Sequence, residues 1–228
     1  MQRQQWKALL YKDLCDLRWN GQILFNTLIA FVFIMIFPMI PGQQVPLSFL
    51  IAFVLALVTT LMQGNMVVEE YEQKTKQRLF QANISPWGII LSKMMLTFMA
   101  TSIILLILVF TYTRSFLEGI GSFLMALPLV IILLFMSTVL GMKSKNTIEV
   151  SLYGVPFMLL YFFIEGLMMN SDQSELKWLA IFPNYHLHYG IVHLHLQQSF
   201  MPYLIVPLLW MAVIILLFAI WFRKRHHS

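Results

Sequence analysis

The sequence predicts an all-α membrane protein: a single transmembrane domain over residues 1–228 that crosses the bilayer six times. Three observations support this fold class. Of the 228 residues, 59% are apolar and 11% are charged, whereas a soluble domain carries about 25% charged residues. Six apolar runs each approach the roughly 20 residues that cross a bilayer as a helix. The basic residues gather in alternate loops, which is typical of membrane proteins.

The first 20 residues contain no span. Between residues 3 and 19, apolar side chains recur at helical spacing and form one stripe: Trp6, Leu9, Leu10, Leu14 and Leu17. This pattern predicts an amphipathic helix that lies in the cytoplasmic interface of the membrane. Asp13 is an exception, because it falls inside the apolar stripe. The alternative interpretation is a short charged lead-in without a fixed helix.

The six predicted spans lie at about residues 22–40, 47–67, 88–111, 120–141, 150–169 and 202–222. None has a lysine or arginine near its centre. Lys93 falls in the first turn of the third span, where its side chain can reach the interface. Residues 170–201, before the last span, are nearly uncharged and rich in His, Tyr, Leu and Gln. We expect short helices there against the outer leaflet, because irregular backbone is not tolerated facing lipid at depth.

The charge distribution predicts the orientation. Of the 15 lysines and arginines, 13 lie in the N-terminal segment, the loops after spans two and four, the start of span three, and the tail. The opposite side holds Arg114 and Lys177. The positive-inside rule therefore places both termini in the cytoplasm of a cell (inner) membrane. The net charge of +5 is explained by the lipid bilayer, and we expect no nucleic acid partner.

No nucleotide-binding loop is evident. The nearest string, Gly141-Met142-Lys143-Ser144, lacks the earlier glycine of a phosphate-binding loop and follows a span where that loop follows a strand. We therefore expect no ATPase site, no catalytic residue and no cofactor in this chain.

The acidic cluster Glu69-Glu70-Tyr71-Glu72 at the end of span two has three interpretations. It can be a solvated loop start, the acid pair of an intramembrane hydrolase, or a short charged helix that docks on a cytoplasmic partner. The hydrolase motif has arginine where this chain has Lys74, and no matching histidine signature appears in a later span.

Four histidines in the outer loop raise the question of a metal: His186, His188, His193 and His195. On a helix, the first and third share one face, and the second and fourth share the opposite face. Seven residues of helix span about 10.5 Å, which is too far for one ion with ligands at roughly 2.0–2.1 Å. We therefore expect packing histidines at the interface and no metal site.

Polar residues inside the spans are candidates for a translocation pathway. Glu165 in span five is costly in lipid, so it either faces the bundle interior or reaches the outer headgroups. Span two carries Thr59, Thr60, Gln63 and Asn65, which favours a helix that faces other helices or a pathway. We take Gln63, Asn65 and Glu165 as the pathway candidates. A single carboxylate argues against proton-driven transport.

The layout as a whole resembles the membrane subunits of ABC exporters of the ABC-2 permease class. That layout has an interfacial helix, six spans, a charged cytoplasmic loop after span two and a longer outer loop before span six. The sharpest local similarity covers residues 69–93: an acidic start at Glu69-Glu70, a coupling helix at 75–81, a break at Ser85-Pro86, and Lys93 in span three.

The resemblance implies an ATP-driven exporter whose ATP and Mg²⁺ are bound by a separate cytoplasmic ATP-binding subunit. Residues 3–19 and 69–87 would transmit the closure of that subunit to the spans. The docking residues it implies are Glu69, Glu70, Glu72, Lys74, Lys76, Arg78 and Pro86. A second permease chain, identical or different, would complete the pathway.

A drug, peptide or lipid-like cargo suits spans with 16 Met and 19 Phe, because flexible methionine surfaces accept varied shapes. Three alternatives stay open. They are a haem-exporter-type permease that uses the outer histidines, a non-transporting membrane immunity protein or chaperone, and an intramembrane hydrolase.

Overall fold

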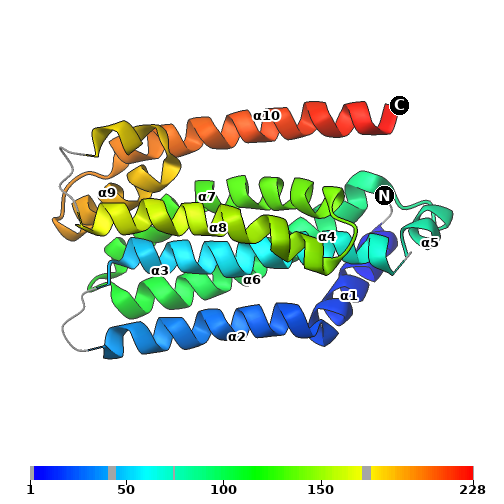
Figure 1. The fold of residues 1–228 in the computed structure, drawn as a ribbon, viewed down its shortest axis with the longest axis horizontal. Coiled ribbons are helices and arrows are strands. Elements are labelled where there is room, and N and C mark those ends of the chain that lie inside the picture. Colours follow the sequence, from blue (N-terminus) through cyan, green and yellow to red (C-terminus); the bar gives the residue numbers. More distant parts are fainter. Residues whose placement is uncertain (1–2, 41–44, 74, 171–175, 228) are drawn as a thin grey trace.

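The computed structural model describes residues 3–40, 45–73, 75–170 and 176–227, and the regular structure within these ranges is entirely helical. This confirms the predicted all-α class. Long helices lie side by side along the long axis of the molecule (Figure 1). Helices α1 and α5 and both termini lie at one end of the bundle, called the α1 end here (Figure 1). Helix α9 lies at the other end, called the α9 end.

The helix predicted over residues 3–19 forms as α1 (Arg3–Trp19), and it joins α2 (Gly21–Ile36) at a bend of 71°. Asn20 caps α2 at the bend, because its side chain accepts a hydrogen bond from the Ile23 backbone N–H at 3.1 Å. The 16 residues of α2 extend roughly 24 Å, short of a hydrocarbon core about 30 Å thick. A 3₁₀ turn, η1 (Phe37–Met39), follows α2.

Among the described residues, five helices are long and apolar enough to span a membrane, or six if the bent pair α1–α2 counts as one span. The first of the five is a continuous helix, Leu47–Glu72, composed of α3 (Leu47–Val54), the π-helical segment η2 (Leu55–Met62) and α4 (Gln63–Glu72). It is the central helix of the bundle, since 83% of its most apolar window is buried. It continues to Glu72, beyond the predicted end at residue 67, so the acidic cluster lies on its last turns and not in a loop.

The next three spans also extend beyond the predicted ranges. They are α6 (Pro86–Tyr112), α7 (Phe116–Lys143) and α8 (Thr147–Asn170), and the short helix α5 (Lys76–Gln81) precedes α6. Ser85 caps α6 by accepting a hydrogen bond from the Gly88 backbone N–H at 3.1 Å. Pro86 follows at the first helical position, where a missing N–H costs nothing.

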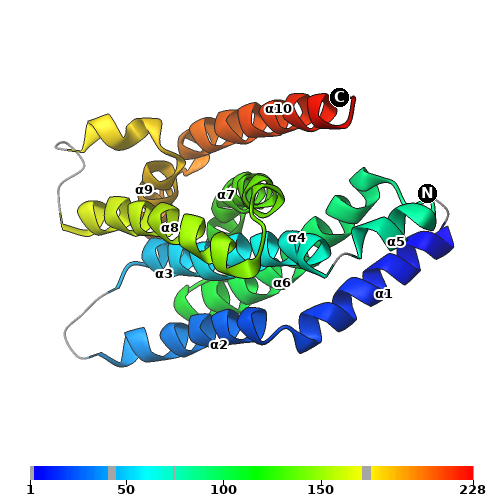
Figure 2. The ribbon, with the colours of Figure 1, turned by 45° about the vertical axis from the view of Figure 1, so that its right-hand side comes forward.

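Short helices precede the last span, as the sequence predicts. They are η3 (Lys177–Ile181), α9 (Pro183–His195) and η4 (Met201–Leu204), which leads into α10 (Ile205–His227). Helix α10 lies along the side of the bundle and packs mainly on α7 (Figures 1 and 2). Only 11% of its most apolar window is buried, so most of its apolar surface is left for lipid or for another chain.

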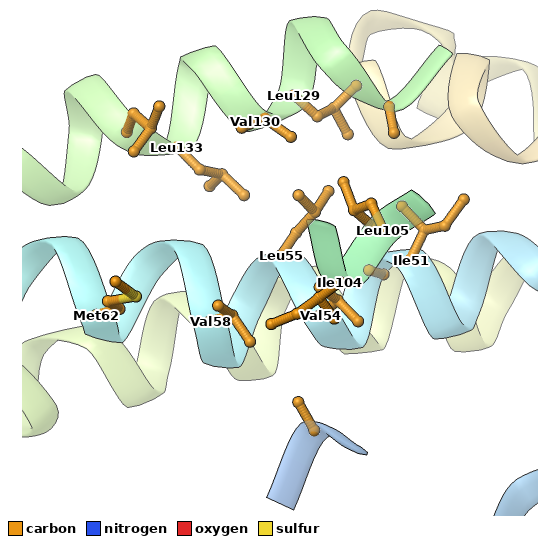
Figure 3. Packing of buried hydrophobic residues seen from close by; sticks show 14 of the residues in the cluster. Ile51, Val54, Leu55, Val58, Met62, Ile104, Leu105, Leu129, Val130 and Leu133 are labelled. Atoms are coloured by element: carbon orange, nitrogen blue, oxygen red, sulfur yellow. The ribbon is translucent and has the colours of Figure 1, made fainter. Parts of the chain in front are cut away.

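The core forms where the central helix meets α6 and α7. Figure 3 shows side chains of this core from all three helices, including Leu55 and Val58 of the central helix, Leu105 of α6 and Leu129 of α7. All of these side chains are buried. Because the central helix contacts α2, α6, α7 and α8, a displacement of its end is felt by most of the bundle.

Candidate functional site

A cluster of buried charges joins three helices at the α1 end. Asp13 of α1 is 0% exposed and Lys93 of α6 is 2% exposed. The Lys93 ammonium lies 3.1 Å from Asp13 Oδ1 and 2.9 Å from Oε1 of Glu70 on α4. One buried ammonium therefore holds a carboxylate from the interfacial helix and a carboxylate from the central helix.

A second ammonium completes this charge cluster. Lys12 Nζ lies 2.6 Å from Glu70 Oε1 and 2.8 Å from Asp16 Oδ2. Burial alone would lower the pKa of Lys12, but hydrogen bonds to Asp16 and Glu70 outweigh it, and the pKa is raised above its ordinary value. The hydroxyls of Ser92 and Thr75 donate to Asp13 and Glu70 respectively. Buried charges are tolerated when they are paired and hydrogen-bonded in this way.

The charge cluster revises the sequence-based interpretation of three residues. Lys93 does not reach for the interface, because it lies about two turns into α6 and is among the most deeply buried large side chains. Asp13 is not a defect in the apolar stripe of α1, because it is the partner that Lys93 requires. Glu70 points inward to the same lysine and so does not present its carboxylate on the surface that a partner would meet.

The cluster acts as an ionic cross-link. Carboxylate oxygens of Asp13, Asp16 and Glu70 lie within 4.8 Å of one another, a spacing that could hold a cation. Two lysine ammoniums already contact these carboxylates. The positive charge that a metal would supply is thus provided by Lys12 and Lys93.

Apolar packing reinforces this cross-link on the side of α5. Leu9 of α1, Ile84 in the α5–α6 connection and Ile89 of α6 form a small buried core, against which Leu79 of α5 packs. Helices α1 and α5 and the start of α6 therefore form one packed unit at the α1 end.

The other predicted docking residues lie around this unit. Glu69 is half-buried and accepts a hydrogen bond from Gln73 Nε2 at 2.6 Å. Glu72 is exposed and accepts from the Thr147 backbone N–H at 3.3 Å, next to the start of α8. Arg78 is exposed on α5, and Pro86 opens α6. Lys74 and the side chain of Lys76 lie outside the described residues.

The polar residues of span two face other helices. Gln63 Nε2 donates to Thr138 Oγ1 of α7 at 2.9 Å. Asn65 is 0% exposed, and its side chain has no hydrogen-bond partner among the described residues. Both residues lie on α4, toward the α1 end, so the structure does not bring them together with Glu165.

Glu165 belongs to a second buried polar group near the α9 end. It is 0% exposed, which rules out the interpretation that it reaches the headgroups. One carboxylate oxygen lies 3.8 Å from His188 Nδ1, and Ser48 Oγ lies 2.8 Å from the same nitrogen. A catalytic serine–histidine–acid relay uses the two ring nitrogens separately, so these three residues do not have the geometry of such a relay.

The remaining histidines have separate partners. His186 Nε2 lies 2.7 Å from the Ala180 carbonyl, and burial lowers the pKa of this imidazole. His193 Nε2 lies 2.9 Å from the Tyr203 hydroxyl, while His195 contacts Glu118. The four histidines therefore hold the short helices of the α9 end in place and do not converge on one point.

The fold defines a multi-pass helical membrane protein with the architecture of a permease. Residues 19–223 match the model of the family described as ABC-2 family transporter protein, and the chain therefore belongs to this family as a membrane permease. Permeases of this family work with ATP-binding subunits. The match begins at the last residue of α1. No curated protein and no solved structure gave a significant match.

Sequence reasoning missed the partners that make Lys93 and Glu70 a site: Lys12, Asp13 and Ser92. A signal was present, however. An aspartate on the apolar stripe of an interfacial helix and a lysine inside a span are each costly alone. Two such residues of opposite sign, on elements that meet at the same side of the membrane, indicate an ion pair.

Proposed function

We propose that this chain is the permease subunit of an ABC exporter. It moves an amphipathic drug, peptide or lipid-like cargo out of the cytoplasm, and a separate ATP-binding subunit supplies ATP, Mg²⁺ and the energy. The outward direction is inferred from the resemblance to exporters. The observation that carries the proposal is the charge cluster of Lys12, Asp13, Glu70 and Lys93, which links the interfacial helix to the central span.

In this proposal the exposed part of the α1 end meets the ATP-binding subunit. Arg78 on α5 and Glu72 at the end of α4 offer charges of both signs to a cytoplasmic partner. Glu70 has a different role from the one that the resemblance implies, because it transmits movement inside the permease. Both termini lie at this same end (Figure 1), in keeping with a cytoplasmic location for the α1 end.

The contacts at the α1 end provide a route by which a movement of α5 reaches the central span. A push on α5 displaces α1 through Leu9 and Leu79, which pack in the same small core. The charge cluster then ties the movement of α1 to α4 and α6, since Lys93 contacts carboxylates from both α1 and α4. The central span consequently moves against α7 and α8, where a pathway for cargo would open.

Two such chains would pair in the membrane, giving a working unit of two permeases and two ATP-binding subunits. The exposed apolar surfaces of α2, α8 and α10 are available for this pairing or for lipid.

Export in cells tests the proposal. Cells express the chain with an ATP-binding subunit whose nucleotide site is intact or inactivated, and efflux of a panel of fluorescent drugs, peptides and labelled lipids is measured. We expect efflux of at least one cargo with the intact subunit and a fall to background with the inactivated one. The Arg78→Glu variant should reduce efflux several-fold while the chain still inserts. Efflux that persists at full rate without any ATP-binding subunit would refute the proposal.

A further inference from the structure

A pocket in the α9 half of the bundle is not explained by the charge cluster or by its coupling role. It has a volume of about 190 Å³ and lies between α7, α8 and α10, with the start of α9 closing one end. Its deep wall is apolar and buried, and is formed by Leu129, Ile132, Leu133 and Ile164. For comparison, an apolar cavity of about 150 Å³ holds a benzene molecule. The pocket therefore admits a chain segment of roughly six to eight carbons.

The mouth of the pocket faces the side of the bundle. Leu160 of α8 lies on its rim and is 55% exposed. Trp210 of α10 also lines the pocket, and its indole N–H donates a hydrogen bond to the Ile181 carbonyl at 2.7 Å. Both residues lie within membrane-spanning helices. A molecule dissolved in the bilayer can thus enter sideways without crossing water.

Two polar groups in the lining are buried and unsatisfied. In the described part of the chain, the Tyr161 hydroxyl and the Asn184 amide nitrogen have no partner at hydrogen-bond distance, and the Asn184 amide lies close enough to the Glu165 carboxyl group to interact with it. These residues are 8% and 4% exposed. Leaving such a group unpaired in a buried site is unfavourable. Both groups can donate a hydrogen bond, so a ligand oxygen placed beside them would satisfy them.

The charge around the pocket selects a neutral ligand. None of the residues that line it is charged. Glu165 lies one helical turn beyond Tyr161, is fully buried and does not line the pocket. Because the lining carries no charge of either sign, neither an anionic nor a cationic head group would find a charged partner there.

We propose that this pocket binds the apolar body of a neutral single-chain amphiphile, such as a long-chain alcohol or ester, whose oxygen accepts hydrogen bonds from Tyr161 and Asn184. The inference rests on the proposed export function, because it names the class of cargo. Entry from the bilayer between α8 and α10 supplies this cargo directly from the membrane.

Photolabelling of the full chain in phosphatidylcholine nanodiscs tests the pocket. The probe is 1-dodecanol with a diazirine in its chain, and labelled residues are located by mass spectrometry. We expect labels on pocket residues of α7, α8 and α10. Unlabelled 1-dodecanol should compete at least tenfold better than dodecane, dodecanoate or dodecylammonium. Labels spread evenly over all lipid-facing helices, or equal competition by dodecane, would overturn the proposal.

Variants sharpen this test. Leu133→Trp fills the pocket and Leu160→Trp narrows its mouth without entering the core, so each should lower labelling at least fivefold. The double variant Tyr161→Phe/Asn184→Leu should remove the preference for dodecanol over dodecane. Leu216→Trp, at a 61% exposed position of α10, is the matched control and should label as the wild type does. Unchanged labelling in both tryptophan variants would refute the proposal that the pocket binds the probe.

A final experiment distinguishes a cargo that is transported from a lipid that stays bound in the pocket. Adding the ATP-binding subunit with ATP should lower dodecanol labelling at least twofold, because cargo leaves as the pathway cycles. Labelling that does not change would overturn the cargo role. The labelling without ATP does not depend on transport, so its failure refutes the pocket and leaves the export proposal standing. Loss of ATP dependence in the efflux assay refutes the export proposal instead.

Discussion

At the scale of single residues, Lys93 holds the helices of the α1 end together. Its ammonium is buried where lipid or protein replaces water, and it is kept there by carboxylates of Asp13 and Glu70 at 3.1 and 2.9 Å. A buried ion pair is weak evidence for added stability, but breaking one by removing a partner is costly. The arrangement therefore favours helices that move together over helices that separate.

Replacing Lys93 with methionine should destabilise the chain by about 3–5 kcal/mol, because Asp13 and Glu70 would be left buried with less compensation. The double variant Lys93→Met/Asp13→Asn should cost less than Lys93→Met alone, since it also removes one of the orphaned charges. Denaturant unfolding in detergent micelles measures both.

Lys145→Met is the matched control, because Lys145 is exposed between α7 and α8; its effect should stay within about 0.5 kcal/mol. A double variant that costs as much as Lys93→Met alone, or more, would contradict the ion pair.

The charge cluster was only partly predictable from the sequence. The sequence pattern identified Glu70 and Lys93 as features of a coupling loop, but it placed both of them at the surface. Their pairing depends on where α1 lies, 80 residues away from Lys93 in the chain. Local patterns describe which face of a helix is apolar; they do not say which charged residue of another helix will meet it.

At the scale of elements, the central helix and α7 approach each other closely where they cross. A Cβ added at Gly141 would lie 2.5 Å from the backbone carbonyl oxygen of Gly64, and 2.8 Å from Cβ of Val67. Backbone cannot move aside as a flexible side chain can. Small residues at such crossings let two membrane helices approach closely.

Gly141→Ala should therefore destabilise the chain by about 1–3 kcal/mol, the usual cost of overpacking, and push α4 away from α7. Thermal unfolding in detergent measures this. Gly166→Ala in α8 is the control and should be neutral or slightly stabilising, because a Cβ there meets nothing within 4 Å. Equal melting temperatures for the two variants would contradict the close crossing.

The lengths of the apolar runs predicted which helices form better than they predicted the residues at which those helices end. The central helix continues to Glu72 because Glu70 pairs with lysines inside the protein, so a charged residue does not mark the end of the helix. The π-helical segment Leu55–Met62 had no signal in the hydropathy pattern. The hydropathy pattern did not show that α2 has only 16 residues, because the apolar run continues through η1.

At the scale of the whole molecule, the long helices place two different environments at opposite ends. The α1 end gathers the charge cluster and both termini (Figure 1). The α9 half holds the apolar pocket and the buried Glu165–His188 group. The family match over residues 19–223 covers the spans that connect them. This arrangement agrees with the proposal of a permease that is driven at the α1 end and binds cargo in the α9 half.

The most direct measurement is native mass spectrometry of the full chain purified from its own membrane in a mild detergent, with no partner added. The account predicts an assembly of two permease chains, including this chain of 26.7 kDa, with two ATP-binding subunits. It further predicts that the Arg78→Glu variant loses the ATP-binding subunits and keeps the pair of permeases. A chain that is released alone, or a pair of permeases that never carries an ATP-binding subunit, would contradict the account.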